Sequence, residues 1–399
     1  MMKVLHLCLA NFYADNLGYQ ENLITKYHKK ENFDVTIIAS CIDYDSRRGA
    51  WVLVSPSEYV NRDGVRVKRI QYKYGRNGLL SRVGKMLRMY DKTLVHIENE
   101  EPDVIFIHGA QFWDVKQVIQ YKRDNPEVKI YADNHADFIN SARNLLSRYI
   151  LHGIIWKHHI RRLEPFCEKF WGVTPNRCDF LRDVYGISEH KIDLLPMCAD
   201  TERVNLKSKD IIRRGIRQKH SLDDHDFVLI SGGKIDERKN IHNLIRAVNK
   251  LANPNIKLLL FGVPTEEMKD EITSLSDTEY VRNVGWIDSN SVYDYYLASD
   301  LGVFPGTHSV LWEQAVGTGL PCIFKKWNGM THVDVGGNCI FVDDGKVNTI
   351  KECIQDVFDD KSKYEEMRSV AVTRGVKFFS YEQIARVSIG YPECSASTV

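Results

Sequence analysis

Short apolar runs rich in β-branched residues alternate with longer segments of helical periodicity along most of the chain. This alternation is typical of repeated βαβ units and of a mainly parallel sheet. The runs form two series, at residues 4–9, 35–39, 65–70, 104–107, 129–132, 170–174 and 192–195, and at residues 227–231, 257–261, 281–284, 301–304, 322–324 and 339–342. We therefore expect an α/β protein with two facing Rossmann-like domains, each built on a parallel sheet.

A polar, highly charged stretch at residues 201–225 separates the two series. The change of composition predicts one Rossmann-like domain at residues 1–203 and a second at 204–375. Two helices, broken near residues 378–380, are expected at the end of the chain. Residues 376–399 are predicted to form a helix and tail that either caps the second domain or crosses back to the first.

Composition excludes several classes of protein. The 399 residues include nine cysteines, never in a CxxC pair, which indicates neither a disulfide framework nor a zinc site. A net charge of only +1 argues against nucleic-acid binding. The chain has no apolar run long enough to span a membrane, and its start lacks the pattern of a secretion signal. We expect a cytoplasmic protein.

The second series carries two lysines beside a glycine turn. Ser231-Gly232-Gly233-Lys234 follows an apolar run, and Lys239 directly precedes an amphipathic helical segment. Two cations at the carboxyl end of a strand and near a helix N-terminus are suited to hold a diphosphate. Solvated loop lysines are the alternative interpretation of the same spacing.

A second loop of the same kind lies at residues 304–310 and leads into Leu311-Trp312-Glu313-Gln314-Ala315. Small residues before a helix expose backbone N–H groups that can bind phosphate. A carboxylate in the first turn, here Glu313, can accept hydrogen bonds from ribose hydroxyls. The alternative is an ordinary first-turn glutamate that interacts favourably with the helix dipole.

In this order, the motifs resemble the second domain of family 4 glycosyltransferases, which have the GT-B fold. Lys234 and Lys239 match the pair that contacts the donor diphosphate in that family. A strand ending in glycine is matched by residues 258–262, and the loop that holds the base by Val284-Gly285-Trp286-Ile287. The family's Glu-Ala-x-x-x-Gly-x-Pro is matched from Glu313 to Pro321.

The resemblance implies a glycosyltransferase that takes its sugar from a nucleoside-diphosphate donor of the UDP or GDP type. The second domain would bind the donor and the first the acceptor. The implied donor-binding residues are Gly18, Gly233, Lys234, Lys239, Gly262, Trp286, Ile287, His308, Ser309, Val310 and Glu313. One departure concerns the family's two glutamates: Pro305 stands where the first is expected, and His308 is the nearest polar substitute.

In the first domain, two histidines end predicted strands, where open α/β sheets place their ligands. His135 corresponds to the strand-end histidine that lies near the donor sugar in the family, and His108 ends the preceding strand. Asn134, Asp137 and His108 are the expected acceptor-binding residues. For both histidines, the alternative is a structural role in the core.

The implied mechanism is transfer with retained anomeric configuration. Lys234 and Lys239 would stabilise the departing diphosphate while His135 meets the sugar, so we expect these three residues to be catalytic. No cofactor and no metal would be required. Asp43-Tyr44-Asp45 has the letters of a metal-binding Asp-x-Asp motif, but we interpret it as a solvated turn.

Two basic, apolar-periodic segments at residues 79–94 and 143–162 could lie on the inner face of an anionic membrane. Together with the resemblance, they suggest a peripheral enzyme of cell-surface polysaccharide biosynthesis whose acceptor is a glycan, for example one linked to polyprenyl diphosphate. Core-facing helices with solvated basic faces are the alternative.

Two other functions fit the same architecture. One is a nucleotide-sugar epimerase or hydrolase, which would need acids around the sugar. The other is a noncatalytic nucleotide-sugar-binding partner subunit, suggested by the missing first glutamate. A dinucleotide oxidoreductase is disfavoured because no Gly-x-Gly-x-x-Gly follows the first strand.

Overall fold

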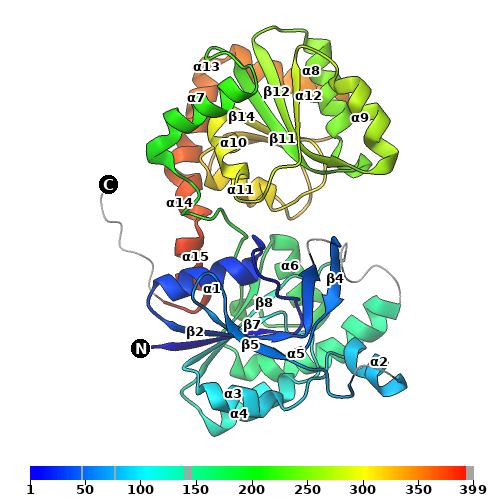
Figure 1. Cartoon of the computed structure of the whole chain (residues 1–399), viewed down its shortest axis with the longest axis vertical. Helices are drawn as coiled ribbons and strands as arrows, with labels where there is room; N and C mark the ends of the chain where they lie inside the picture. Colours follow the sequence, from blue (N-terminus) through cyan, green and yellow to red (C-terminus); the bar gives the residue numbers. More distant parts are fainter. Residues whose placement is uncertain (46–47, 76–77, 139–140, 142–145, 392–399) are drawn as a thin grey trace. The chain divides into compact units, whose positions relative to one another are not determined.

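A computed structural model describes residues 1–45, 48–75, 78–138, 141 and 146–391 (Figure 1). Contacts divide the chain into two compact units. Unit 1 comprises Met1–Pro196 with Glu382–Val399, and unit 2 comprises Met197–Tyr381.

The division falls a few residues before the boundary expected at 203/204. Ala199 exchanges backbone hydrogen bonds with Phe379 and Tyr381, and the backbone N–H of Asp200 donates to the Tyr293 hydroxyl at 3.0 Å. These contacts attach the segment after the last strand of unit 1 to unit 2. At the other end, the chain leaves unit 2 at Tyr381 rather than at 375, and the last helix belongs to unit 1.

Unit 1 is built on a largely parallel sheet in the order β10-β9-β8-β7-β1-β2-β6-β5, with only the β5–β6 pair antiparallel. Its strands are β1 (Lys3–Cys8), β2 (Asp34–Ser40), β5 (Ser57–Val60), β6 (Arg66–Ile70), β7 (Val104–His108), β8 (Lys129–Asn134), β9 (Lys169–Gly172) and β10 (Ile192–Leu194). Strand order reverses between β1 and β7, which makes this the switch point where open sheets bind ligands.

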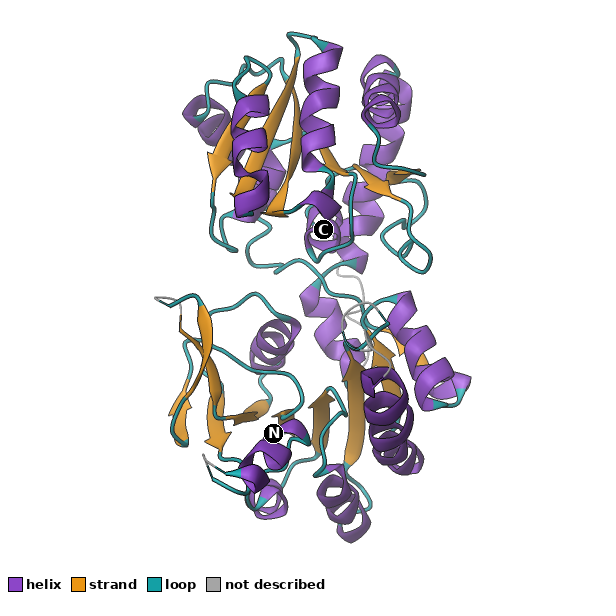
Figure 2. Cartoon of the chain, turned by 90° about the vertical axis from the view of Figure 1, so that its right-hand side faces the viewer, coloured by secondary structure: helices purple, strands orange, loops and turns teal. Residues whose placement is uncertain are grey.

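Helices flank this sheet on both sides (Figure 2). They are α1 (Gln20–Lys30), α2 (Leu79–Met86), α3 (Thr93–Glu100), α4 (Val115–Asp124), α5 (Lys157–Leu163), α6 (Pro175–Phe180) and α15 (Tyr381–Ser388). Two π-helices, η1 (Leu146–Trp156) and η3 (Leu181–Tyr185), and two 3₁₀-helices, η2 (Glu164–Phe166) and η4 (Glu189–Lys191), complete the described set.

Unit 2 has an all-parallel sheet in the order β13-β12-β11-β14-β15-β16, which is the doubly wound order of dinucleotide-binding folds. Its strands are β11 (Phe227–Ile235), β12 (Ile256–Pro264), β13 (Val281–Gly285), β14 (Leu301–Phe304), β15 (Cys322–Lys325) and β16 (Cys339–Val342). The switch point lies between β11 and β14.

The helices of unit 2 are α7 (Lys209–Lys219), α8 (Ile241–Leu251), α9 (Lys269–Ser276), α10 (Val292–Ala298), α11 (Leu311–Gly317), α12 (Val347–Asp359), α13 (Lys361–Val370) and α14 (Val376–Phe378). Three 3₁₀-helices, η5 (Leu206–Ser208), η6 (Glu237–Lys239) and η7 (Glu266–Met268), and the π-helix η8 (Ala371–Gly375) complete the described helices of this unit. The expected break at residues 378–380 is present between α14 and α15.

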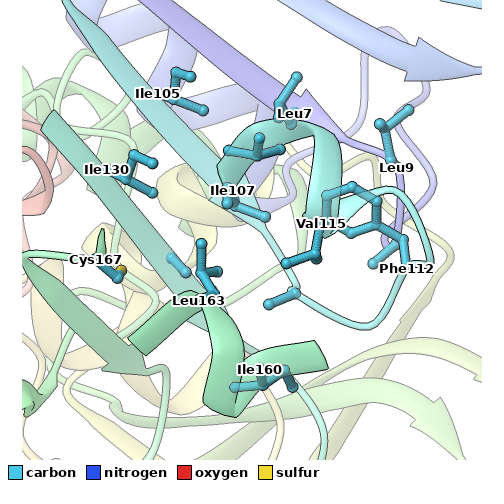
Figure 3. Close-up of a cluster of buried hydrophobic side chains, with 14 of the residues drawn as sticks. Leu7, Leu9, Ile105, Ile107, Phe112, Val115, Ile130, Ile160, Leu163 and Cys167 are labelled. Atoms are coloured by element: carbon cyan, nitrogen blue, oxygen red, sulfur yellow. The ribbon is translucent and has the colours of Figure 1, made fainter. Parts of the chain in front are cut away.

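Each unit has its own apolar core. In unit 1, Leu7 of β1, Ile107 of β7 and Ile130 of β8 pack with Val115 of α4 and Leu163 of α5 (Figure 3). In unit 2, the inner strands pack against α8 and α12 through residues such as Leu229, Leu244 and Ile354. Burial of these side chains, at about 25 cal/mol per Å² of apolar surface, is the main force that holds each sheet to its helices.

Two sequence expectations about local structure are wrong. Asp43-Tyr44-Asp45 is not a turn: it lies in β3 (Ile42–Asp45), which pairs with β4 (Ala50–Leu53), and the rings of Tyr44 and Trp51 lie 5.4 Å apart across this hairpin. The helix expected at residues 79–94 ends at Met86, because Arg88 and Lys92 adopt left-handed backbone angles.

Among the described residues, no helix is both long and apolar enough to cross a membrane.

Candidate functional site

The carboxyl ends of β11 and β14 form the switch point of unit 2, and most of the donor-binding residues predicted for this unit lie at the end of β11 or in the segments that follow these two strands. Gly233 and Lys234 lie near the end of β11, Lys239 follows in η6, and beyond β14 lies the loop at residues 305–310. The two segments are joined directly: the Thr307 backbone N–H donates to the Arg238 carbonyl at 3.0 Å.

Two glycines allow β11 and β12 to approach closely at this edge. Gly233 and Gly262 are partners in the parallel register and have φ of +104° and +107°. A Cβ on Gly262 would collide with the Gly233 carbonyl oxygen, and a Cβ on Gly233 would lie 2.8 Å from Leu311. Since L side chains rarely adopt such angles, glycine is required at both positions.

The two predicted lysines differ in their surroundings. Lys234 is exposed at the end of β11, whereas Lys239 is partly buried and donates to the backbone carbonyls of Thr307 and His308 at 2.7 and 3.2 Å. Burial lowers the pKa of Lys239 to about 8, although Asp236 opposes the shift. Lys239 therefore places an ammonium group at the switch point, and that group can lose its proton near physiological pH.

Glu313, in the first turn of α11, is completely buried. Its Oε1 accepts hydrogen bonds from His308 Nε2 at 2.7 Å and from His332 Nε2 at 2.9 Å. Burial favours the neutral acid, but His308 and His332 outweigh it and lower the pKa of Glu313 to about 2. Glu313 is therefore a carboxylate, held by one predicted histidine and by one that the sequence did not indicate.

Part of this cluster is left unsatisfied. Glu313 Oε2 and His332 Nδ1 are buried and have no hydrogen-bond partner among the described residues. A buried acceptor without a partner costs about 1–3 kcal/mol, so Oε2 is suited to accept from a ligand hydroxyl. The ligand atoms of His308, Glu313 and His332 also lie within 4.8 Å of one another, a spacing that a divalent cation can use.

The remaining predicted donor residues of unit 2 lie on the same side of the sheet, at strand ends. Ser309 and Val310 directly precede α11, and Val310 occupies its N-cap position. Trp286 and Ile287 follow β13, and the Trp286 side chain is 72% exposed. An exposed indole next to a strand end offers a flat apolar surface for a base.

In unit 1, the switch point between β1 and β7 carries Gly18 and His108. Gly18 lies in the loop between β1 and α1, two residues before α1 begins at Gln20. His108 ends β7 and is completely buried; its Nε2 faces His6 and its Nδ1 faces Asp133. Because His108 is buried and both of its ring nitrogens have partners, it is not placed to contact an acceptor directly as expected.

His135 is the accessible histidine of this pair. Its side chain is 24% exposed, and its Nε2 lies 3.3 Å from Asp133 Oδ2, the oxygen that His108 also contacts. Burial disfavours the charged ring, but the Asp133 carboxylate outweighs this effect and raises the pKa of His135. His135 is thus an imidazole whose orientation and charge depend on Asp133.

The neighbouring polar residues are largely occupied. Asn134 accepts from Gln111 at 2.9 Å and donates to the carbonyls of Ala136 and Arg177. Asp137 lies 3.3 Å from Nε of Arg177 and is buried. Both residues are thus bonded within unit 1, where they fix the loop that carries His135.

The two basic segments expose apolar side chains. Leu79, Leu80 and Met86 of α2 are 76, 66 and 59% exposed, and Ile150 and Ile154 of η1 are also exposed. Arg88, just after α2, lies 6.0 Å from the ring of Trp156 at the end of η1. Arg143 and Leu145, which belong to the second predicted segment, lie outside the described residues.

Comparison with known proteins agrees with this architecture. The family model for glycosyl transferases group 1 matches residues 212–373, which lie within unit 2. A lipopolysaccharide core biosynthesis glycosyltransferase, LpsD of Rhizobium meliloti, is 27% identical over 148 residues, which are 35% of this chain and 42% of that protein. The chain thus spans less than half the length of this relative.

Several solved structures have the same fold over nearly the whole chain. Anabaena HepE in complex with UDP covers 97% of this chain and 98% of its own, with a TM-score of 0.64 and 14% identity. Sucrose-phosphate synthase from Thermosynechococcus elongatus gives a TM-score of 0.65 at 16% identity, covering 98% of each chain. UDP-GlcNAc 2-epimerase from Neisseria meningitidis, bound to UDP-GlcNAc, gives 0.63 at 13% identity and covers 98% of this chain and 99% of its own. The chain therefore has the GT-B fold, and its second unit is matched by the family model for glycosyl transferases group 1.

Proposed function

We propose that this protein is a glycosyltransferase that moves a sugar from a nucleoside-diphosphate sugar to a glycan or lipid-linked acceptor with retention of anomeric configuration. The observation that carries the proposal is the position of the Lys239 ammonium at the β11–β14 switch point, where it donates to the carbonyl of His308, the residue whose ring contacts Glu313. UDP is the favoured nucleotide, because HepE and the epimerase, which share the fold, are described with UDP or a UDP-sugar bound.

In this proposal Lys239 and Lys234 bind the diphosphate. A cation that faces the departing phosphate stabilises the charge that develops as the glycosidic bond breaks. Lys239 is held by two carbonyl groups, so its charge is oriented before the donor binds. Glu313 would accept from the ribose through Oε2, while His308 and His332 keep it ionised through Oε1.

In unit 1, His135 is assigned to the donor sugar. Burial disfavours the charged form of His135, but the Asp133 carboxylate outweighs this effect and raises the pKa of the ring. The ring can therefore carry positive charge near neutral pH. Such a ring can donate a hydrogen bond to a sugar hydroxyl or to the diphosphate. His108 is then a residue behind the site, and it acts through Asp133.

The decisive assay is nucleotide release from a panel of UDP- and GDP-sugars, followed by mass spectrometry with and without added acceptor. Release that depends on acceptor supports a transferase. Release without acceptor, with an epimerised or free sugar as product, would assign an epimerase or hydrolase instead. Binding without turnover of any donor would indicate a noncatalytic partner subunit and contradict the proposal.

Lys239→Ala is the test variant for this assay. Lys250→Ala is its matched control, because Lys250 lies at the far end of α8 and contacts Asn348 instead of the switch point. We expect loss of nucleotide release in the first variant only. Equal release from both variants would remove Lys239 from the reaction.

We further propose a peripheral contact of unit 1 with the inner face of the membrane, where a polyprenyl-diphosphate-linked glycan would serve as acceptor. The supporting observation is the exposed apolar surface of α2 beside the exposed base Arg82. At low salt, the native protein should co-sediment with anionic vesicles. The double variant Leu79→Ser/Leu80→Ser should co-sediment to a smaller extent. Val95→Ser, at an exposed apolar residue of α3, is the control. Equal sedimentation of all three proteins would contradict the contact.

The similarity to a lipopolysaccharide core enzyme favours a role in cell-surface polysaccharide biosynthesis. Assays with lipid-linked oligosaccharide acceptors, compared with soluble glycans, would test this part of the proposal.

A further inference from the structure

A row of three buried histidines begins at Asp133 and extends into the interior of unit 1. His108 contacts Asp133, and two further rings follow it. His108 Nε2 lies 3.0 Å from His6 Nδ1, and His6 Nε2 lies 2.9 Å from His28 Nδ1. His28 Nε2 lies 2.6 Å from the carbonyl oxygen of Ala385 in α15. The three rings have no exposed surface. We call His28, His6 and His108 the histidine chain.

Both ends of the histidine chain are acceptors. At one end, Asp133 receives His108 Nδ1 at 2.9 Å. At the other end, a backbone carbonyl can only accept, and the Ser388 hydroxyl donates to the same carbonyl at 2.7 Å. His28 Nε2 must therefore carry a hydrogen.

The number of protons follows from these ends. Four contacts join Asp133, the three rings and Ala385, and each contact needs one hydrogen between its two heavy atoms. Three neutral imidazoles supply one hydrogen each. The histidine chain is thus complete only with one proton more than three neutral rings hold.

The extra proton belongs at the Asp133 end. Burial, and then the neighbouring rings, lower the pKa of His6 well below its usual range; burial lowers that of His28 to about 4. Burial disfavours the Asp133 carboxylate, but His135 and His108 lower its pKa, so it is ionised. An imidazolium at His108 beside this carboxylate satisfies all four contacts and leaves the buried group neutral overall.

We propose that Asp133 and the histidine chain form a proton-holding support that positions His135 and sets its protonation. Asp133 Oδ2 is shared by His108 and His135, so the imidazolium of His108 already balances the carboxylate that His135 faces. His135 is held with Nε2 toward Asp133. Because the carboxylate is already paired with the His108 imidazolium, it stabilises a positive charge on His135 less than an unpaired carboxylate would. Glu21 and Arg177 also face His135, and the Cys8 thiol is buried near Asp133. The catalytic meaning rests on the proposed function, but the proton arrangement does not.

Two amide substitutions distinguish this support from mere packing. In His6→Gln, the amide oxygen accepts from His108 and the amide N–H donates to His28, so the polarity of the neutral ring is kept. In His108→Gln, no ring of the histidine chain remains beside Asp133 to carry the proton, and only the His135 ring can balance the carboxylate. His159→Gln, at a buried histidine of α5 outside the histidine chain, is the control.

The readout is NMR of ¹⁵N-histidine-labelled protein, which reports the protonation of each ring nitrogen without any donor. We expect His108 to be doubly protonated at pH 8, with His6 and His28 neutral. His108→Gln should move the midpoint of the His135 titration upward by roughly one pH unit. The Asp133 carboxylate is then no longer balanced by His108 and stabilises only the positive charge of His135. His6→Gln and His159→Gln should leave that midpoint unchanged.

If the protein transfers glycosyl groups, the pH–rate limb that belongs to His135 should shift upward in His108→Gln only. Three neutral rings in the native protein at pH 8 would overturn the proposal, and this measurement does not require any variant to fold. Equal shifts of the His135 midpoint in His6→Gln and His108→Gln would also overturn it. Absence of transferase activity with the expected NMR result would instead refute only the proposed function.

Discussion

Replacing Glu313 with glutamine tests whether the buried carboxylate organises the site of unit 2. The substitution keeps the size of the side chain but removes the charge that two histidines stabilise at 2.7 and 2.9 Å. The amide oxygen can still accept both bonds in the place of Oε1, but its N–H₂ group then replaces the unpartnered Oε2 and is itself buried without an acceptor. We expect lower stability of unit 2, without loss of its fold.

The magnitude follows from the pKa. Burial raises it, but His308 and His332 bring the pKa of Glu313 from 4.5 to about 2. At 1.36 kcal/mol per pH unit, this difference corresponds to about 3 kcal/mol at neutral pH, close to the 3–5 kcal/mol typical of a broken buried ion pair. Because the folded pKa lies below the unfolded one, this stability is complete above pH 4.5 and is lost as pH falls through about 2.

Urea unfolding, followed by hydrogen exchange of peptides from α11 and β14, measures the stability of unit 2 separately. Glu313→Gln should lose about 3 kcal/mol at pH 7 and roughly half of that at pH 3, where part of the native advantage has disappeared. Glu352→Gln, on the exposed surface of α12, should change nothing at either pH. A loss below about 1 kcal/mol at pH 7, or a loss that does not depend on pH, would refute the reasoning.

Three further predictions concern the same edge of the sheet. Gly262→Ala forces a side chain against the Gly233 carbonyl at φ +107°, so it should lower the melting temperature and abolish donor binding. Gly215→Ala in α7, where the added Cβ meets open space, should do neither. Equal melting curves of the two variants would contradict this prediction. Donor affinity should fall as pH rises above 8, since the pKa of Lys239 is lowered to about 8 by burial, and Lys239→Arg should bind independently of pH from 7 to 9 when measured by calorimetry. Dialysis against a chelator should leave turnover unchanged; activity lost and then restored by zinc would instead assign His308, Glu313 and His332 as a metal site.

The sequence predicted the parts of the fold that local patterns determine. Apolar runs located the central strands of both sheets, and the glycine and lysine spacing located the β11 edge, because these features depend on neighbours in the chain. The β3–β4 hairpin and β5 were missed, since their residues are polar or exposed and their pairing depends on partners distant in sequence.

The hydrogen-bonded clusters were harder to predict. His332 lies in the loop after β15, and the only signal was that β15 ends beside β14, so its loop had to reach the same edge. His6 and His28 carry no motif, and their contact with His108 arises from the strand order β7-β1 and from packing of α1. A single histidine on an apolar face gives no indication of a continuous chain.

Calorimetric titration with UDP, and with GDP in parallel, tests the central claim that the β11–β14 edge binds a nucleoside diphosphate through Lys239. The native protein should bind one of the two nucleotides, and Lys239→Ala should bind it about 10- to 100-fold more weakly, as expected when a charged hydrogen bond worth about 1.5–3 kcal/mol is removed. Lys250→Ala should bind like the native protein. Equal affinity of the Lys239→Ala and native proteins, or no binding of either nucleotide by the native protein, would contradict the claim.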